Sequence, residues 1–227
     1  FFFFKQKTAY EIVDCDWSSD VCSSDLRPAE AGYTPPERTT YGCHPELGLA
    51  LLKSLMEQGF DVAQSQVLPV GRMGNNGVPH AFGYVYRRVM EDAVVPHVPL
   101  FVNTHYPPNR PAAARCVAFG HALARAIAAW PGDARIALVA SGGMSHYVID
   151  EDFDRDLLAA MAAGDEAHIG AIDAAMFEAG TAEVLDWLVL FGAMRECRLP
   201  MTLADYVPCY RSEAGTGNAM AFAHWNA

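Results

Sequence analysis

Three side chains that lie far apart in the chain have the chemistry of an acid–base or metal site. His146 lies in SHYVID, shortly after an apolar run that ends in two glycines. His80 lies in another glycine-bounded loop, NNGVPHAFG, and Glu183 opens the strongly apolar run TAEVLDWLVLFGAM. Imidazole and carboxylate groups both ligate metals, and imidazole exchanges protons near neutral pH. We therefore predict a metal or acid–base site built from these side chains.

The segment RIALVASGGMSHYVID predicts how His146 is positioned. Residues 135–140 are apolar, small or β-branched, which is typical of a buried strand. A Ser-Gly-Gly turn follows, so His146 is expected near the carboxyl end of that strand, where open α/β sheets bind ligands. Asp150 is expected to cap a helix over residues 151–163.

The remaining periodicities predict alternating helices and strands. Helices are expected from Pro45 to just before Gly59 and over 80–90, 112–129, 166–179 and 181–194. Strands are expected over 60–68 and 98–103, and as two short strands around a Ser/Gly turn within 205–225. The predicted fold class is α/β, a single domain with a central sheet flanked by helices on both faces.

Residues 1–26 differ from the rest of the chain. They open with four phenylalanines and close with the near-repeat WSSDVCSSD, and they lack the pattern of a secretory signal. They look like translated sequencing-adapter read-through or a disordered tail. We expect the domain to comprise residues 27–227 and to lack its N-terminal part.

Composition narrows the function classes. The 227 residues are 52% hydrophobic, which is enough for a substantial core, and the formal net charge is −11. An acidic chain without a basic run does not favour nucleic acid, and the apolar runs are shorter than the ~20 residues of a membrane span. None of the six cysteines forms a CxxC pair. Cys116 and Cys197 are expected to be buried free thiols in a cytoplasmic protein.

Several motifs, in this order, resemble those of a known family. They are YGCHPELGLALLKSLMEQGFDVAQS, PHAFGYVYRRVM, NTHYPPN, GGMSHYVID, AEVLDWLVLFGAM and DYVPCYRSEAGTG. The chain resembles the class III extradiol ring-cleavage dioxygenases, in particular the catalytic-subunit type of protocatechuate 4,5-dioxygenase. The resemblance covers roughly residues 40–225.

The resemblance implies an iron(II) enzyme that opens catechol-type rings with dioxygen. Glu183 matches the glutamate ligand of the family and His146 its acid–base histidine. His80 matches a second pocket histidine that contacts substrate or oxygen. The family's two histidine ligands precede the HPEL segment, whereas no histidine precedes His44 in this sequence. The chain is therefore expected to bind iron poorly and to be inactive alone.

The resemblance also implies partners. The expected substrate is a small catecholic acid such as protocatechuate, gallate or a relative, together with dioxygen. The protein is expected to form a homo-oligomer or to associate with a small partner subunit.

The residues by themselves leave alternatives open. Glu183 can simply complement a helix dipole, and Asp186, one turn later, is a competing carboxylate. Ser145 beside His146 suggests a metal-independent serine hydrolase, although the G-x-S-x-G motif is absent. A non-catalytic subunit or binding module of the same fold is a further alternative. Five other histidines are expected to be structural or surface residues: His97, His105, His121, His168 and His224. Among them, the place of His105 beside a proline-rich turn favours a position lining a pocket.

Overall fold

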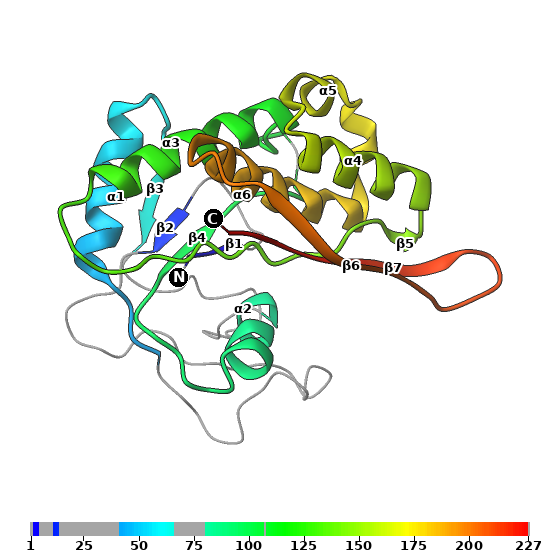
Figure 1. Cartoon of the computed structure of the whole chain (residues 1–227), viewed down its shortest axis with the longest axis horizontal. Helices are drawn as coiled ribbons and strands as arrows, with labels where there is room; N and C mark the ends of the chain where they lie inside the picture. Colours follow the sequence, from blue (N-terminus) through cyan, green and yellow to red (C-terminus); the bar gives the residue numbers. More distant parts are fainter. Residues whose placement is uncertain (1, 5–10, 14–40, 66–79, 107, 227) are drawn as a thin grey trace. The chain divides into compact units, whose positions relative to one another are not determined.

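The structure is a computed structural model of the chain and describes residues 2–4, 11–13, 41–65, 80–106 and 108–226. It combines helices and strands throughout, so the predicted α/β class is confirmed (Figure 1). The chain divides into two compact units. The first comprises residues 1–102 and 129–141, and the second comprises residues 103–128 and 142–227. That residues 27–227 form one domain stays a prediction.

The first unit contains a mixed sheet in the order β1-β4-β2-β3. Its strands are β1 (Phe2–Phe4), β2 (Glu11–Val13), β3 (Ala63–Ser65) and β4 (Val98–Phe101). β4 runs parallel to β1 and antiparallel to β2, and β2 runs parallel to β3. β3 and β4 fall inside the predicted strands. β1 and β2 lie within residues 1–26, which the sequence analysis does not include in the domain. The start of the domain at residue 27 stays a prediction.

Helix α1 (Pro45–Glu57) forms where its local signals predict it. Pro45 occupies the first turn, where no backbone N–H is needed, and His44 Nδ1 accepts the Leu47 N–H at 3.3 Å. Leu51 and Leu55 are fully buried on the face of the helix that packs against β2 and β4. The apolar stripe read from the sequence is therefore the face that covers this sheet.

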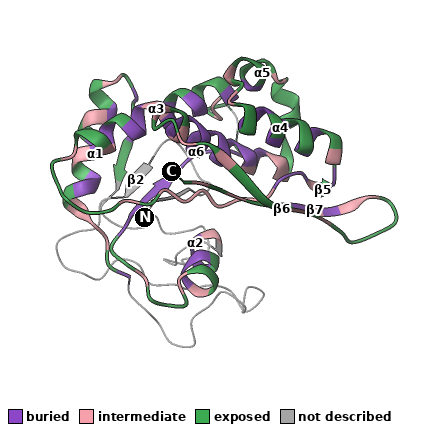
Figure 2. Ribbon diagram, viewed as in Figure 1, coloured by how far each residue is buried: buried purple, intermediate pink, exposed green. Residues whose placement is uncertain are grey.

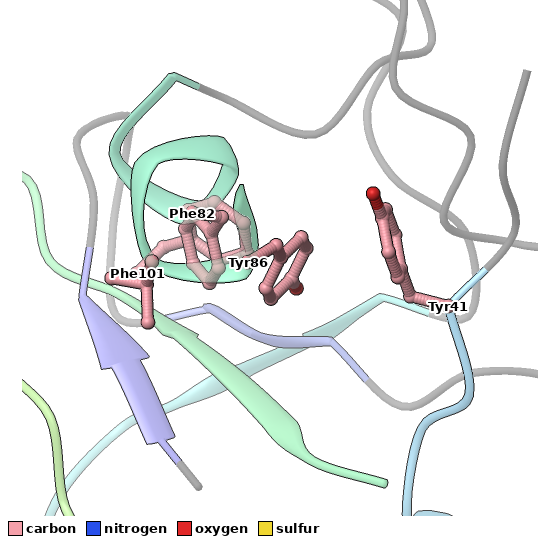
Figure 3. Close-up of a cluster of buried hydrophobic side chains, with 5 residues drawn as sticks. Tyr41, Phe82, Tyr86 and Phe101 are labelled. Atoms are coloured by element: carbon pink, nitrogen blue, oxygen red, sulfur yellow. The ribbon is translucent and has the colours of Figure 1, made fainter. Parts of the chain in front are cut away.

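An aromatic cluster forms the core beside α2 (His80–Tyr84) and the π-helix that continues it, Val85–Val89 (Figure 3). The Tyr86 ring centroid lies 4.4 Å from that of Tyr41, and Phe82 lies 5.3 Å from Phe101. Tyr86 is buried, whereas Tyr84 is partly exposed. The predicted helix over 80–90 is confirmed, with its second half wound as a π-helix.

His97 is a structural histidine at the edge of this cluster, as predicted. The residue is 1% exposed, with Nδ1 3.1 Å from the Val95 carbonyl oxygen and Nε2 2.5 Å from the Tyr86 hydroxyl. A carbonyl only accepts hydrogen bonds, so Nδ1 carries the proton and the neutral Nε2 accepts from Tyr86. Burial disfavours the charged ring and lowers the pKa of His97 from 6.5 to about 4.

This burial makes stability depend on pH. Between pH 6.5 and about pH 4 the unfolded chain protonates His97 and the folded chain does not, so stability falls as the pH falls. The loss over this range is ~3 kcal/mol at most. His97→Gln keeps an acceptor for Tyr86 but does not titrate. Urea unfolding across this range should show the wild type losing more stability than the variant, and parallel curves would contradict the assignment.

The second unit contains an antiparallel sheet and most of the helices. Its sheet has the order β5-β7-β6 and is formed by β5 (His146–Val148), β6 (Met201–Tyr210) and β7 (Thr216–Trp225). Its α-helices are α3 (Ala113–Ala129), α4 (Glu151–Ala163), α5 (Glu166–Ala171) and α6 (Val184–Glu196). The predicted strand pair near the C-terminus is confirmed and is longer than expected. Asp150 caps α4 as predicted, accepting the Phe153 N–H at 3.0 Å.

Helix α6 is the core of this unit. Every residue from Val184 to Ala193 is buried (Figure 2). A Cβ on Gly192 would overlap the Val117 carbonyl oxygen of α3, and one on Gly120 would overlap the Val189 carbonyl oxygen of α6. The two helices therefore meet backbone to backbone. None of the helices in the described part of the chain is both long and apolar enough to cross a membrane.

Two predicted elements are wrong. Residues 135–140 form no strand, and only Leu138 makes an isolated bridge, because a strand exists only where a neighbouring backbone supplies a ladder of hydrogen bonds. The predicted helix over 166–179 ends at Ala171. The chain is extended at Ile172, and Asp173 caps a separate 3-10 helix by accepting the Ala175 N–H at 2.9 Å.

The cysteine predictions are half right. Cys116 is a free thiol fully buried in α3, and burial raises its pKa. Cys197 is free but exposed, because it lies just beyond the last turn of α6, where that helix leaves the core.

Candidate functional site

The structure brings His146 and Glu183 together. His146 opens β5, and Glu183 ends the 3-10 helix Ala179–Glu183 (η4), which leads directly into α6. His146 Nε2 lies 3.8 Å from Glu183 Oε2, and the two side chains are 16% and 28% exposed. Two residues separated by 37 positions (183 − 146) thus form one partly open acid–base pair.

Hydrogen bonds fix the tautomer and direction of the His146 ring. Nδ1 lies 2.7 Å from the Met144 carbonyl oxygen and must donate to it. The His146 backbone N–H donates to Thr181 Oγ1 at 3.2 Å. With Nδ1 occupied by a proton, Nε2 is the ring nitrogen left to exchange a proton or accept a hydrogen bond, and it is the nitrogen nearest Glu183.

Two glycines make room for this ring. A Cβ on Gly143 would overlap His146 Cε1, and a Cβ on Gly180 would overlap His146 Cβ. Gly142, beside them, has φ +157°, and its carbonyl oxygen accepts the Trp187 indole N–H at 3.1 Å. The Ser-Gly-Gly turn predicted from the sequence therefore serves close packing around the histidine.

The geometry separates the two competing carboxylates. Glu183 Oε2 is partly exposed and accepts the Gly143 N–H at 3.2 Å. Asp186 is 2% exposed, and its Oδ1 has no hydrogen-bond partner in the described part of the chain. Burial, and then the nearby charge of Glu183, raise the pKa of Asp186. Glu183 is therefore the carboxylate that faces the site, and Asp186 is enclosed in the core.

Ser145 is not placed as a nucleophile. It is 1% exposed, and its hydroxyl donates to Asp154 Oδ2 at 2.7 Å while accepting the Asp150 N–H at 2.9 Å. A serine nucleophile needs a histidine base at its hydroxyl and access to substrate. Here the neighbouring His146 Nδ1 instead bonds to Met144. The geometry contradicts the serine-hydrolase alternative.

With this geometry established, sequence comparison identifies the family. The family described as the catalytic LigB subunit of aromatic ring-opening dioxygenase matches residues 12–216. The chain belongs to this family.

A curated relative agrees with the LigB assignment. The chain is 29% identical to a gallate dioxygenase from Pseudomonas putida over 186 residues, which is 73% of this chain and 50% of the relative. The chain thus spans about half the length of the curated relative that it matches.

In this LigB chain His105 also approaches the site elements. Its Nδ1 donates to the Ala179 carbonyl oxygen at 3.2 Å, at the start of the same 3-10 helix that ends with Glu183. Ala179 has φ +50°, which is unfavourable for a residue with a Cβ. The sequence places His105 with the structural histidines, and its position beside the proline-rich turn was the one signal of a nearby pocket.

The remaining predicted site residue, His80, lies in another element. His80 is the first residue of α2, in the first unit, and its side chain lies outside the described part of the chain. Within the described residues, no group of three or more histidine, cysteine, aspartate or glutamate side chains could hold a metal ion. Glu183 is thus one oxygen donor without a complete ligand set there. The roles of His80, His146 and Glu183 stay predictions.

The glycine packing predicts the effect of one added methyl group. Gly180→Ala should displace His146 and lower the unfolding free energy by ~1–3 kcal/mol, because the new Cβ overlaps His146 Cβ. Gly170→Ala is the matched control: its Cβ would lie 3.6 Å from the Ala114 Cβ, an ordinary contact. That helical substitution should be neutral or stabilise by up to ~1 kcal/mol. Equal urea unfolding of both variants would contradict the packing.

Proposed function

We propose that the function of this LigB domain is the iron(II)-dependent extradiol opening of a catecholic aromatic acid by dioxygen, with little activity from the present chain alone. The observation that carries the proposal is the His146–Glu183 pair, with Nε2 directed to a carboxylate oxygen 3.8 Å away in a chain of the LigB family. Opening a catechol requires a group that transfers protons, and His146 Nε2 beside the Glu183 carboxylate can serve as that group.

Glu183 is proposed as a ligand of the iron. Its carboxylate oxygen is partly exposed, while the Gly143 N–H holds it in place at 3.2 Å. Oxygen and imidazole donors suit iron(II), and the bound metal would supply the centre at which catechol and dioxygen meet. The described residues offer no complete ligand set for this metal.

His146 is proposed as the acid–base residue. The proton on Nδ1 is committed to the Met144 carbonyl, so Nε2 takes a hydroxyl proton from the substrate and later returns one to the departing oxygen. While Nε2 holds that proton, the Glu183 oxygen 3.8 Å away balances its charge. His80 is proposed to hydrogen-bond the substrate or oxygen.

The substrate proposal follows the family and its relative. The curated relative is a gallate dioxygenase, so gallate is the first compound to test, followed by protocatechuate. The proposed partners are the small aromatic acid, dioxygen, and a second copy of the chain or a small subunit. The proposed location is the cytoplasm.

Variants at the two roles should fail in different ways. The test uses the protein encoded at the genomic locus, with the codons that precede Arg27 there, because residues 1–26 are not expected to belong to the domain. The protein is loaded with iron(II) under anaerobic conditions. Glu183→Ala should lose bound iron and turnover together, because a ligand is removed. His146→Ala should keep its iron while ring opening slows ~10²–10⁴-fold. Iron analysis and the absorbance of the ring-opened product measure both effects.

His168→Gln is the control, because His168 is exposed on α5 and pairs with Asp156 Oδ2 at 2.6 Å, remote in sequence from both candidate residues. It should match the wild type. Undiminished ring opening by His146→Ala would remove His146 from the mechanism. A wild-type protein that neither binds iron nor opens either ring would favour the non-catalytic alternative instead.

A further inference from the structure

A buried carboxylate holds the residue that precedes His146. Asp154 Oδ1 accepts the Ser145 N–H at 2.9 Å, and Asp154 Oδ2 accepts the Ser145 hydroxyl at 2.7 Å. Asp154 and Ser145 are 0% and 1% exposed. Both oxygens of this carboxylate therefore accept hydrogen bonds from a single residue of the loop.

The same carboxylate joins this loop to two other elements. Asp154 lies in α4, and the Tyr206 hydroxyl of β6 donates to Asp154 Oδ2 at 2.8 Å. The Asp150 N–H, at the cap of α4, donates to Ser145 Oγ at 2.9 Å. Hydrogen bonds to a charged acceptor are stronger than those between neutral groups. They offset the cost of burial, which raises the pKa of Asp154.

The backbone beyond His146 needs such an anchor. Tyr147 has φ +68°, a left-handed conformation that is strained for a residue with a bulky side chain. Its side chain is 64% exposed, so its own packing contributes little to holding it there. The contacts around Ser145, together with the pairing of β5 to β7, must hold this strained turn.

The ring of His146 depends on the same turn. Its Nδ1 acceptor is the carbonyl of Met144, two residues back, so the Ser145 peptide links the ring to its own acceptor. A rotation of that peptide would separate the two and release Nε2 from its direction toward Glu183. Asp154 bonds both the N–H and the hydroxyl of Ser145 and so opposes that rotation.

We propose that Asp154 is the positioning residue of His146, acting through Ser145 to hold the imidazole in one tautomer with Nε2 toward Glu183. The effect of Asp154 on the opening of the substrate rests on the proposed function. Its effect on the His146 imidazole does not. The two are therefore tested by separate measurements.

The first measurement is the ¹⁵N NMR spectrum of the His146 ring, assigned with His146→Gln. The wild type should show one Nδ1–H tautomer. Asp154→Ala should give a mixture, and Asp154→Asn, whose amide oxygen still accepts the Ser145 N–H, should lie between them. Tyr206→Phe removes one hydrogen-bond donor to Asp154 and leaves both bonds between Asp154 and Ser145. This variant tests the role of Asp154 if the Asp154 variants fold poorly. It should slightly broaden or shift the ¹⁵N signal of the His146 ring. Asp152→Asn, exposed on the same helix, is the control.

The second measurement is ring-opening kinetics with gallate on the iron-loaded variants. kcat should fall by about 10²-fold in Asp154→Ala and less in Asp154→Asn, because misplacement of about an ångström has that effect. KM and iron content should not change. An unchanged His146 tautomer in all Asp154 and Tyr206 variants would overturn the proposal, as would KM and iron falling together with kcat. If the wild type opens no ring, the proposed function fails, and the NMR result alone decides the positioning role.

Discussion

The backbone contact between α3 and α6 is the constraint on which the second unit depends. Gly120 and Gly192 let the helices approach until a Cβ at either position would overlap a carbonyl oxygen of the other helix. Such a contact buries α6 on every side from Val184 to Ala193. The start of α6, and with it Glu183, is thereby held by the core of the unit and not by a mobile loop.

The candidate site applies the same device on a smaller scale. Gly143 and Gly180 leave space for the His146 ring, in the same way that glycines leave space between the two helices. The Met144 carbonyl then sets the tautomer, and the Glu183 carboxylate accepts a backbone N–H of the turn. Close packing and directed hydrogen bonds thus act together to hold the acid–base pair in one geometry.

Three carboxylates differ in environment: Glu183 of this pair, Asp154 and Asp186. That difference separates their roles. Glu183 is partly exposed and is held by one backbone donor, so it can meet a ligand. Asp154 is buried but accepts three hydrogen bonds, so it acts as an anchor. Asp186 is buried with an unpartnered oxygen and a raised pKa, which favours its neutral form. The residue type is nearly the same in each case, and the surroundings decide the chemistry.

The sequence by itself determined the elements with local signals. Pro45 in the first turn of α1, Asp150 at the cap of α4 and the apolar stripe of α3 each act within a few residues, so these helices were predicted correctly. The residues of the candidate site came partly from their types and partly from the family resemblance. Neither source gives the 3.8 Å distance that separates the side chains of His146 and Glu183.

Only the tertiary structure decided what depends on partners far away in the chain. Residues 135–140 have the composition of a strand but lack its ladder, because pairing requires a neighbour that local sequence does not specify. The same reason applies to Glu183 and Asp186, one helical turn apart, whose exposure differs because of the way α6 is packed. Ser145 stands beside a histidine in the sequence, as a serine nucleophile could, but its hydroxyl donates to Asp154, nine positions later. Periodicity and caps are properties of neighbouring residues, whereas pairing, burial and hydrogen-bond partners arise only when the chain folds on itself.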